Sequence, residues 1–378
     1  MNRYIQRKEC RLEKYVVALN RYQFVTKELR RMMADLPQDA RLPGIRALME
    51  RFQVSQVTVA RALTDLVQSS EVVHRPGRGY FSTTFCAERK RRRVAFCFCY
   101  QRKRMDNPLY GVMIAAFLQQ ADIHDYELNV FACDEMEESG KFRARFEGNQ
   151  PSCCVLLGCS NQSFLYVLRD LKIPIVQLYP NVIAGEEPVV LIDNHAIIEL
   201  LIDHLTGLGH KHIAMLHGQG FDNTHMFDQE ERMEAFYQIL KRRALPFSAS
   251  RSMLYGGFDT ETGYQAAMRL LDTAPELRPS AIIANDYIAA GVYRAAAELG
   301  LRIPDDLSVT GIDNLPQCLS LSPLLTTVDI EWSAAVDLVV HLIENPADGN
   351  PLRRTPVKLI KRASTGAPLI IINQKRSF

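Results

Sequence analysis

The chain has 378 residues and almost balanced charge, with 45 Lys and Arg against 43 Asp and Glu. Its length accommodates two or three domains with well-buried cores. Because it contains neither an apolar run long enough to span a bilayer nor a secretory signal pattern, we expect a cytoplasmic protein without a membrane partner.

Charge is distributed unevenly along the chain. Residues 1–93 hold 20 Lys and Arg against 9 Asp and Glu, a net charge of +11, whereas residues 94–378 hold 25 against 34, a net charge of −9. A basic head on an acidic body is typical of a protein that binds nucleic acid through the head alone.

The N-terminal region begins with predicted helices. Residues 1–21 mix charged with apolar positions and predict a helical extension, and residues 22–35 predict the first helix of a domain that ends at residue 83. A second, short helix is predicted over residues 45–52. Its apolar positions follow helical spacing and are Ile45, Leu48, Met49 and Phe52.

A third helix is predicted directly after this one. Ser55 stands where an N-cap is needed, since its hydroxyl can accept a hydrogen bond from the first turn. The polar positions that we expect to face outward are Gln56, Thr58, Arg61 and Asp65. The outward start of a second helix is what a DNA-binding helix-turn-helix presents to base edges, where Gln suits adenine and Arg suits guanine.

A hairpin is predicted next, from strands at 72–75 and 80–83 that flank Pro-Gly-Arg-Gly. Glycines supply the positive φ that such a turn needs and allow a close approach to phosphate. Arg75 and Arg78 are placed to contact a DNA backbone, and the alternative is a plain hairpin with solvated arginines.

Three linked motifs connect these elements: Leu42-Pro43-x-x-Arg46-x-Leu48, Val54-Ser55-x-x-Thr58-Val59-x-x-Ala62-Leu63-x-x-Leu66, and Arg75-Pro76-Gly77-Arg78-Gly79-x-Phe81. With them, residues 24–83 resemble the winged helix-turn-helix of GntR-type bacterial transcription regulators. The resemblance implies DNA contacts at Arg46, Ser55, Gln56, Thr58 and Gly77. Gln56 and Ala60 stand where that family usually has arginines, so we expect an operator sequence that differs from those of relatives.

A basic linker is predicted over residues 84–93, which end in five consecutive basic residues. A charge run of this kind is either a solvated tether or a source of additional phosphate contacts.

From residue 94 the pattern changes to alternating strands and helices. The first strand, residues 94–99, is continuously apolar, as in a parallel sheet that is covered on both faces. Similar strands are predicted at 126–132, 153–158, 173–178, 189–193, 211–217, 252–255, 280–284 and 307–312, with helices between most of them. The fold class is therefore α/β, and the length fits two doubly wound lobes.

The motifs Val190-x-x-Asp193-Asn194, Ala284-Asn285-Asp286, Gly311-Ile312-Asp313 and Pro323-Leu324-x-Thr326-Thr327-Val328 belong to this region. They resemble the periplasmic-binding-protein-like effector domain of LacI-type repressors. The combination with a GntR-type head is similar to arabinose repressors. The resemblance implies an effector domain over 94–378, with one lobe from 94–192 and 329–352 and the other from 193–328 and 353–370.

A ligand of such a fold binds beyond the carboxyl ends of the strands. Asn285 and Asp313 end two predicted strands, where the alternative role is helix capping. The resemblance adds Arg232 and Trp332, and we expect Trp332 with Tyr110 and Phe258 to stack on a sugar face unless they pack in the core. Tyr179 follows the strand 173–178, where many sugar-binding relatives carry an acidic residue.

The chain shows no motif for catalysis, for a cofactor or for a metal. His210 and His212 lack an evident third ligand. The nine cysteines have no zinc spacing, so we expect reduced core thiols, with a redox switch as the alternative.

Together these features predict a bacterial repressor that binds double-stranded operator DNA as a homodimer, under control of a small molecule, most simply a sugar. The alternatives are a non-sugar effector, a corepressor in place of an inducer, and a sugar-processing enzyme with an accessory DNA-binding domain.

Overall fold

The computed structural model describes residues 21–368 except 23, 31, 34–35, 38, 84–91, 101–107, 125, 149, 219–226, 249–251, 256, 258 and 346–351. The predicted extension before residue 21 and most of the predicted linker lie outside the described residues. The chain divides into two compact units, the first comprising residues 1–92 and 121–127 and the second residues 93–120 and 128–378.

The first unit, here called the head, contains a helix-turn-helix and a hairpin. Described residues from 21 to 33 are helical, and α2 (Ile45–Phe52) and α3 (Gln56–Gln68) follow. Strands β1 (Val72–Arg75) and β2 (Gly79–Ser82) pair antiparallel, and Arg41 forms a bridge with Phe81. The predicted winged helix-turn-helix is confirmed.

Local chemistry explains the junction between α2 and α3. Gln53 adopts the left-handed conformation that ends α2, with φ 53°. The Ser55 hydroxyl then accepts a hydrogen bond from the Thr58 N–H at 3.3 Å, as expected for an N-cap. Beneath this turn the apolar sides of the helices form one core, which includes Leu29, Leu48 and Leu63, each fully buried.

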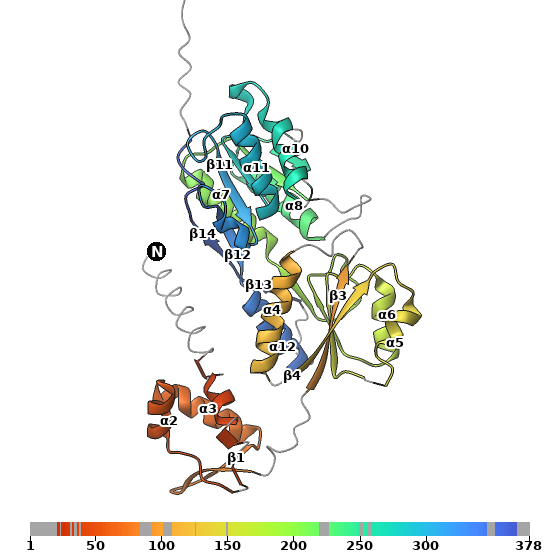
Figure 1. The fold of residues 1–378 in the computed structure, drawn as a ribbon, viewed down its shortest axis with the longest axis vertical. Coiled ribbons are helices and arrows are strands. Elements are labelled where there is room, and N and C mark those ends of the chain that lie inside the picture. The colour runs from red at the N-terminus through yellow and green to blue at the C-terminus, as the bar shows by residue number, and fades with distance from the viewer. Residues whose placement is uncertain are drawn as a thin grey trace, which may run out of the picture. The chain divides into compact units, whose positions relative to one another are not determined.

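The second unit, here called the sensor, holds two six-stranded sheets (Figure 1). The first sheet has the order β13-β7-β6-β5-β3-β4. Its strands are β3 (Arg92–Tyr100), β4 (Tyr126–Asp134), β5 (Cys153–Leu157), β6 (Ile175–Leu178), β7 (Val189–Ile192) and β13 (Leu352–Thr355). Its helices are α4 (Pro108–Ile123), α5 (Ser139–Ala144), α6 (Gln162–Asp170) and α12 (Trp332–Glu344).

The second sheet has the order β14-β12-β11-β10-β8-β9, and β14 alone runs antiparallel to its neighbour among the pairs that are described. Its strands are β8 (Ile213–His217), β9 (Met253–Tyr255), β10 (Ala281–Ala284), β11 (Ser308–Ile312), β12 (Thr326–Ile330) and β14 (Val357–Ile360). Its main helices are α7 (Asn194–Gly207), α8 (Phe227–Arg242), α10 (Thr260–Leu271) and α11 (Asp286–Glu298). The predicted α/β class and the two-lobed architecture are confirmed.

The chain crosses between the two sheets three times. The first crossing is at Asp193, as expected, and the second follows Ile330, slightly later than predicted. The third was expected near residue 352, but β13 pairs with β7 as far as Thr355 opposite Ile192. The third crossing therefore lies at Pro356, because residues 352–355 gain a parallel partner in the first sheet.

Helices α10 and α11 pack closely against each other. A Cβ at Gly291 would lie 2.3 Å from the Tyr264 backbone nitrogen, and a Cβ at Gly263 would lie 2.7 Å from the Ile288 carbonyl oxygen. Only glycine fits at both positions. In the part of the chain that is described, no helix is long and apolar enough to cross a membrane.

Candidate functional site

One face of α3 is exposed while the other fills the core of the head. Val59, Ala62 and Leu66 are fully buried on the inner face. Four of the exposed residues form an outward stripe, defined here as Gln56, Val57, Arg61 and Thr64. Val57 is 77% exposed and was not singled out in the sequence.

Two residues that were expected on this outward face are turned partly inward. The Thr58 hydroxyl lies 2.9 Å from that of Ser55 and is half-buried, so both hydroxyls serve the helix cap. Asp65 is also half-buried, and burial raises the pKa of its carboxyl, while the charges of Arg61 and Arg30 lower it. Thr58 and Asp65 are therefore only partly exposed, and their place among the outward-facing residues stays a prediction.

Arg61 is held by an aromatic ring. Its guanidinium carbon lies 4.3 Å from the centroid of the ring of Tyr22, which belongs to the first helical segment of the head. Stacking uses the face of the guanidinium and leaves its edge, where the N–H donors lie, available to a partner. Arg46 is exposed in the first turn of α2.

The wing presents its basic residues unequally. Gly77 has φ +72° and a Cβ there would meet nothing within 4 Å, so the tip is open, and Arg78 beside it is exposed. Arg75 instead makes two hydrogen bonds with Asp39, at 3.1 and 2.5 Å. Its charge is therefore balanced within the head, which leaves less of it for a DNA backbone than the sequence indicated.

Arg41 is a basic residue at the wing that sequence reasoning missed. It is exposed, and its Nε would lie 3.5 Å from a Cβ placed on Gly79. Its position directly before the Leu42-Pro43 motif was the available signal.

In the sensor, two of the predicted ligand residues meet at the carboxyl ends of β10 and β11. Asn285 donates a hydrogen bond through Nδ2 to Oδ2 of Asp313 at 3.0 Å. Burial raises the pKa of Asp313, Arg232 and the hydrogen bond from Asn285 lower it, and the charge of Asp228 raises it. The carboxylate thus has one amide as a hydrogen-bond donor and lies within the electrostatic influence of one arginine.

Arg232 belongs to a second group of polar side chains on α7 and α8. It is buried and donates through Nε to Oδ1 of Asn194 at 2.7 Å. Nδ2 of Asn194 is 2.9 Å from both Oδ1 of Asp228 and Oε2 of Glu231. Sequence reasoning missed Asp228 and Glu231, although Asp228 stands four residues before Arg232 and so shares its helix face.

Two predicted aromatic residues reach this region from the first sheet. The Tyr179 hydroxyl lies 2.6 Å from Oγ1 of Thr355, and the Tyr179 ring meets that of Trp332 edge to face at 5.7 Å. Burial raises the pKa of Tyr179 far above its usual range, and the nearby charge of Asp228 adds to the effect. The tyrosine is therefore neutral and hydrogen-bonded. The side chain of Tyr110 and the whole of Phe258 lie outside the described residues.

Three of the eight non-glycine residues with positive φ in the described part of the chain are site residues or their neighbours. Tyr179, Asp313 and Asn314 have positive φ values of 45°, 103° and 52°. Non-glycine residues in this conformation cost energy and cluster at ligand sites more often than elsewhere.

Asp286 lies behind the site. It is fully buried at the start of α11 and accepts hydrogen bonds from the Leu315 N–H at 2.6 Å and the Thr327 hydroxyl at 2.8 Å. Burial, together with the charge of Asp313, raises the pKa of Asp286 to about 7. It supports the strand end that carries Asp313.

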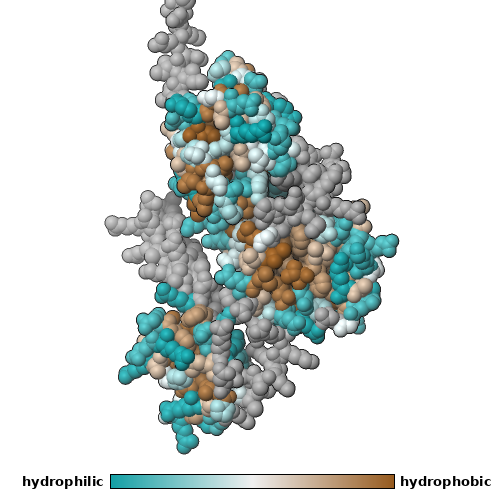
Figure 2. All heavy atoms as spheres, viewed as in Figure 1, coloured by the Kyte–Doolittle hydropathy of each residue, from teal (hydrophilic) through white to brown (hydrophobic). Residues whose placement is uncertain are grey.

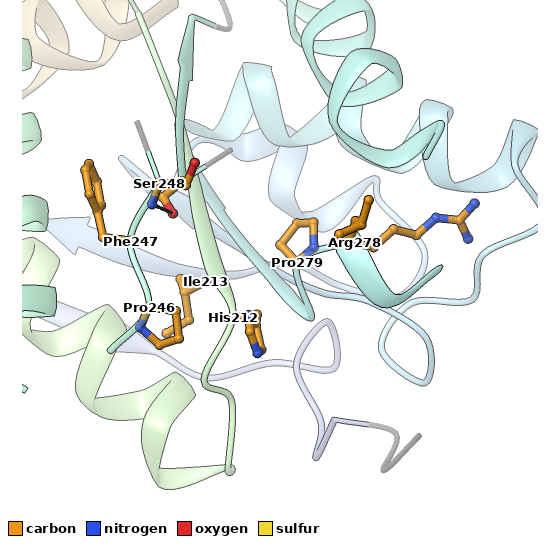
Figure 3. Close-up of a pocket in the computed structure, with 9 residues that line it drawn as sticks. His212, Ile213, Pro246, Phe247, Ser248, Arg278 and Pro279 are labelled. Atoms are coloured by element: carbon orange, nitrogen blue, oxygen red, sulfur yellow. Dashed lines mark hydrogen bonds between the residues drawn. The ribbon is translucent and has the colours of Figure 1, made fainter. Parts of the chain in front are cut away.

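A separate small cavity of about 140 Å³ lies at the opposite ends of the strands, near the start of β8 and β10 (Figure 3). Its walls include Ile213, Pro246, Phe247 and Pro279, and Arg278 directs its Nε to the carbonyls of Leu271 and Thr273. It contains none of the predicted ligand residues.

His210 and the described cysteines play structural roles. His210 is buried and bonds Ser280, Ser308 and the Gly366 carbonyl at 2.8 to 3.0 Å. The seven described cysteines are buried and unbridged, and burial raises the pKa of Cys153 to about 12. No group of three metal-ligating side chains occurs among the residues that were placed.

Comparison with known proteins matches each of the two units to a protein family. Residues 21–81 match the family model of bacterial regulatory proteins of the gntR family, and residues 202–365 match that of the periplasmic binding protein-like domain. Over 113 residues the chain is 42% identical to a lactose operon repressor of Rhizobium radiobacter, covering 29% of this chain and 97% of that protein. The chain belongs to the GntR-type transcription regulators with a LacI-type effector domain.

For two further relatives of this GntR–LacI regulator, either the match spans less of the relative or the sequence identity is lower. A probable repressor of Bacillus subtilis, ExuR, is 28% identical over 215 residues, which span 56% of this chain and 61% of that protein. A LacI-family regulator of Enterococcus faecium with bound ribose superposes with a TM-score of 0.60 at 23% identity, covering 72% of this chain and 99% of that one. This second likeness establishes the fold of the sensor.

The family match covers most of the candidate residues of this regulator. The outward stripe and the wing lie in the gntR-family range, and Arg232, Asn285, Asp313 and Trp332 lie in the periplasmic-binding-protein-like range. Tyr179 lies before that range, so its role depends on the geometry alone. The relatives named here are regulators or repressors and not enzymes.

Proposed function

We propose that the chain is a cytoplasmic repressor that binds double-stranded operator DNA through its head and releases it when a sugar binds to the sensor. The observation that carries this proposal is the convergence of polar side chains at Asp313. The Asp313 carboxylate accepts a hydrogen bond from the Asn285 amide, and the charge of buried Arg232 acts on it, while no group of three metal-ligating side chains occurs among the described residues.

For the head, the outward stripe supports DNA binding. Gln56 and Arg61 offer hydrogen-bonding groups that match adenine and guanine, at the start of the second helix of a helix-turn-helix. Arg46, Arg41 and Arg78 are exposed around it and suit contacts with phosphates.

For the sensor, the side chains suit a ring of hydroxyl groups. Asp313 and Asp228 accept hydrogen bonds, Arg232 donates them, and such charge-assisted bonds are short and strong. Trp332 and Tyr179 provide aromatic surface beside them. The names of two relatives, a lactose operon repressor and a regulator with bound ribose, agree with a sugar effector.

A homodimer is part of this proposal, because helix-turn-helix proteins commonly place two recognition helices on near-palindromic sites. Apolar surface gathers on the lobe of the first sheet (Figure 2). Exposed apolar side chains there include Leu118 on α4 and Val130 on the edge strand β4. Patches of this kind mark interfaces between proteins.

A second candidate is a regulator that responds to a non-sugar effector or uses it as a corepressor. Tyr179 favours it, because its hydroxyl is engaged with Thr355 at a position where many sugar-binding relatives carry a carboxylate. The same head and the same site would serve either kind of effector.

The test is a thermal-shift screen of the full-length protein against pentoses, hexoses, deoxysugars, uronic acids and nucleosides, followed by operator binding with each hit. A ligand at about 100 times its Kd stabilises the folded state by about 2.7 kcal/mol, a readily measured shift. A sugar that stabilises the protein and weakens operator binding supports the proposal. Stabilisation only by non-sugars, or tighter operator binding with ligand, supports the second candidate instead.

A further inference from the structure

Val57 is exposed in a way that folding does not explain. Its side chain is 77% exposed in the first turn of α3, whereas the other exposed large apolar residues described in the head are Phe24 at 51%, Val73 at 43% and Leu36 at 36%. A β-branched residue also lowers helix propensity slightly, so its place on α3 brings no gain in helix stability.

The neighbours of Val57 leave its methyl groups uncovered. Ala60, one turn later on the helix, is small, and Arg61 is drawn onto the Tyr22 ring. Gln56 precedes it on the same outward stripe. The result is one apolar spot between two polar side chains whose donors and acceptors suit base edges.

We propose that Val57 recognises a thymine in the operator half-site through the thymine 5-methyl group. This inference rests on the proposed function of the head. In the major groove the 5-methyl group is the apolar feature that distinguishes thymine from the other bases, and apolar side chains pack against it. A helix that enters the groove by its first turn brings Val57 to the base edges together with Gln56.

The experiment uses duplexes selected from a random pool by the full-length chain. Each thymine of the selected half-site is replaced in turn by deoxyuridine, which removes the methyl group and keeps the hydrogen-bonding edge. We expect one position at which the replacement weakens binding by about fourfold, the effect of exposing one buried methyl group.

Three variants connect that position with Val57. Val57→Ser should bind the thymine and deoxyuridine duplexes equally, and Val57→Thr, which retains one methyl group, should restore part of the preference. Val73→Ser, a matched change on β1, should leave the fourfold ratio unchanged.

The outcomes separate this inference from the proposed function. Specific binding by the wild type without any sensitive thymine, or a sensitivity that Val57→Ser retains, overturns the role of Val57 alone. Failure to select any specific duplex overturns DNA recognition by the head, and the role of Val57 with it.

Discussion

Arg354 on β13 bonds Glu231 on α8, and so joins a strand of the first sheet to a helix of the second. Its two terminal nitrogens lie 3.1 and 2.5 Å from the two carboxylate oxygens, and Nη1 also donates to the Ile192 carbonyl at 3.0 Å. Glu231 in turn accepts from Asn194. The pair lies next to the crossings at Asp193 and Pro356, where lobe movement would be concentrated.

Glu231→Gln should change the effector response without removing it. The pair is only partly exposed, so its loss should lower the free energy of unfolding by about 1 kcal/mol and shift the effector concentration that half-releases operator. Titration of operator release measures the shift. Glu261→Gln breaks the exposed pair with Arg294, away from the crossings, and should leave that titration unchanged.

Asp313→Ala should abolish the effector response and leave operator affinity intact. Removal of a charged hydrogen-bonding group costs about 1.5 to 3 kcal/mol of binding, or at least tenfold in effector Kd. Calorimetry with the identified effector provides the measurement, with Asp305→Ala, at a side chain that is 59% exposed, as the control. A variant that remains fully inducible would exclude Asp313 from the site.

Arg61→Ala should weaken specific operator binding by about 1 to 3 kcal/mol and relax the preference at one base position. Arg78→Ala should weaken binding to all sequences alike. It should also reduce the slope of the logarithm of the binding constant against the logarithm of the salt concentration by about one. Both follow from binding isotherms at several salt concentrations. Equal loss of specific and non-specific binding for Arg61→Ala would place it on a phosphate instead.

Asp286 should make the stability of the sensor depend on pH. Its pKa of about 7 in the folded chain lies above the value of about 3.9 expected in the unfolded chain. The protonated Asp286 side chain therefore makes its full contribution to the free energy of unfolding below a pH of about 4. This contribution is lost as the pH rises through about 7. Between a pH of about 5 and 8, the Tm of Asp286→Asn should fall less than the Tm of the wild type. An identical fall in both proteins would contradict the raised pKa of Asp286.

Local features of the chain were predictable from sequence because they depend on neighbours along the chain. The N-cap at Ser55 and the wing turn at Gly77 follow from short patterns. The α/β class follows from the alternation of strands and helices, and the two lobes follow from the length and the family resemblance. The position of Asn285 beside Asp313 follows from the rule that parallel strands end at one edge.

Contacts between segments that are distant in the sequence could not be predicted in this way. Nothing near Arg75 in the sequence indicates that Asp39 balances its charge, and nothing near Tyr179 indicates that its hydroxyl meets Thr355. The third crossing was misplaced for the same reason, since β13 is a strand only because β7 offers it a partner. The exposure of Val57 was also not predicted, because it depends on which neighbouring side chains cover its methyl groups in the folded head.

The contact of α10 with α11 at Gly263 and Gly291 has a consequence for genetics. Any side chain at either position would push the two helices apart, and Asn285 at the start of α11 would move with them. A screen for non-inducible mutants should therefore yield substitutions at these glycines as well as at the polar residues around Asp313. Such substitutions would impair the response to the effector by displacing a helix. The variant proteins would still repress transcription.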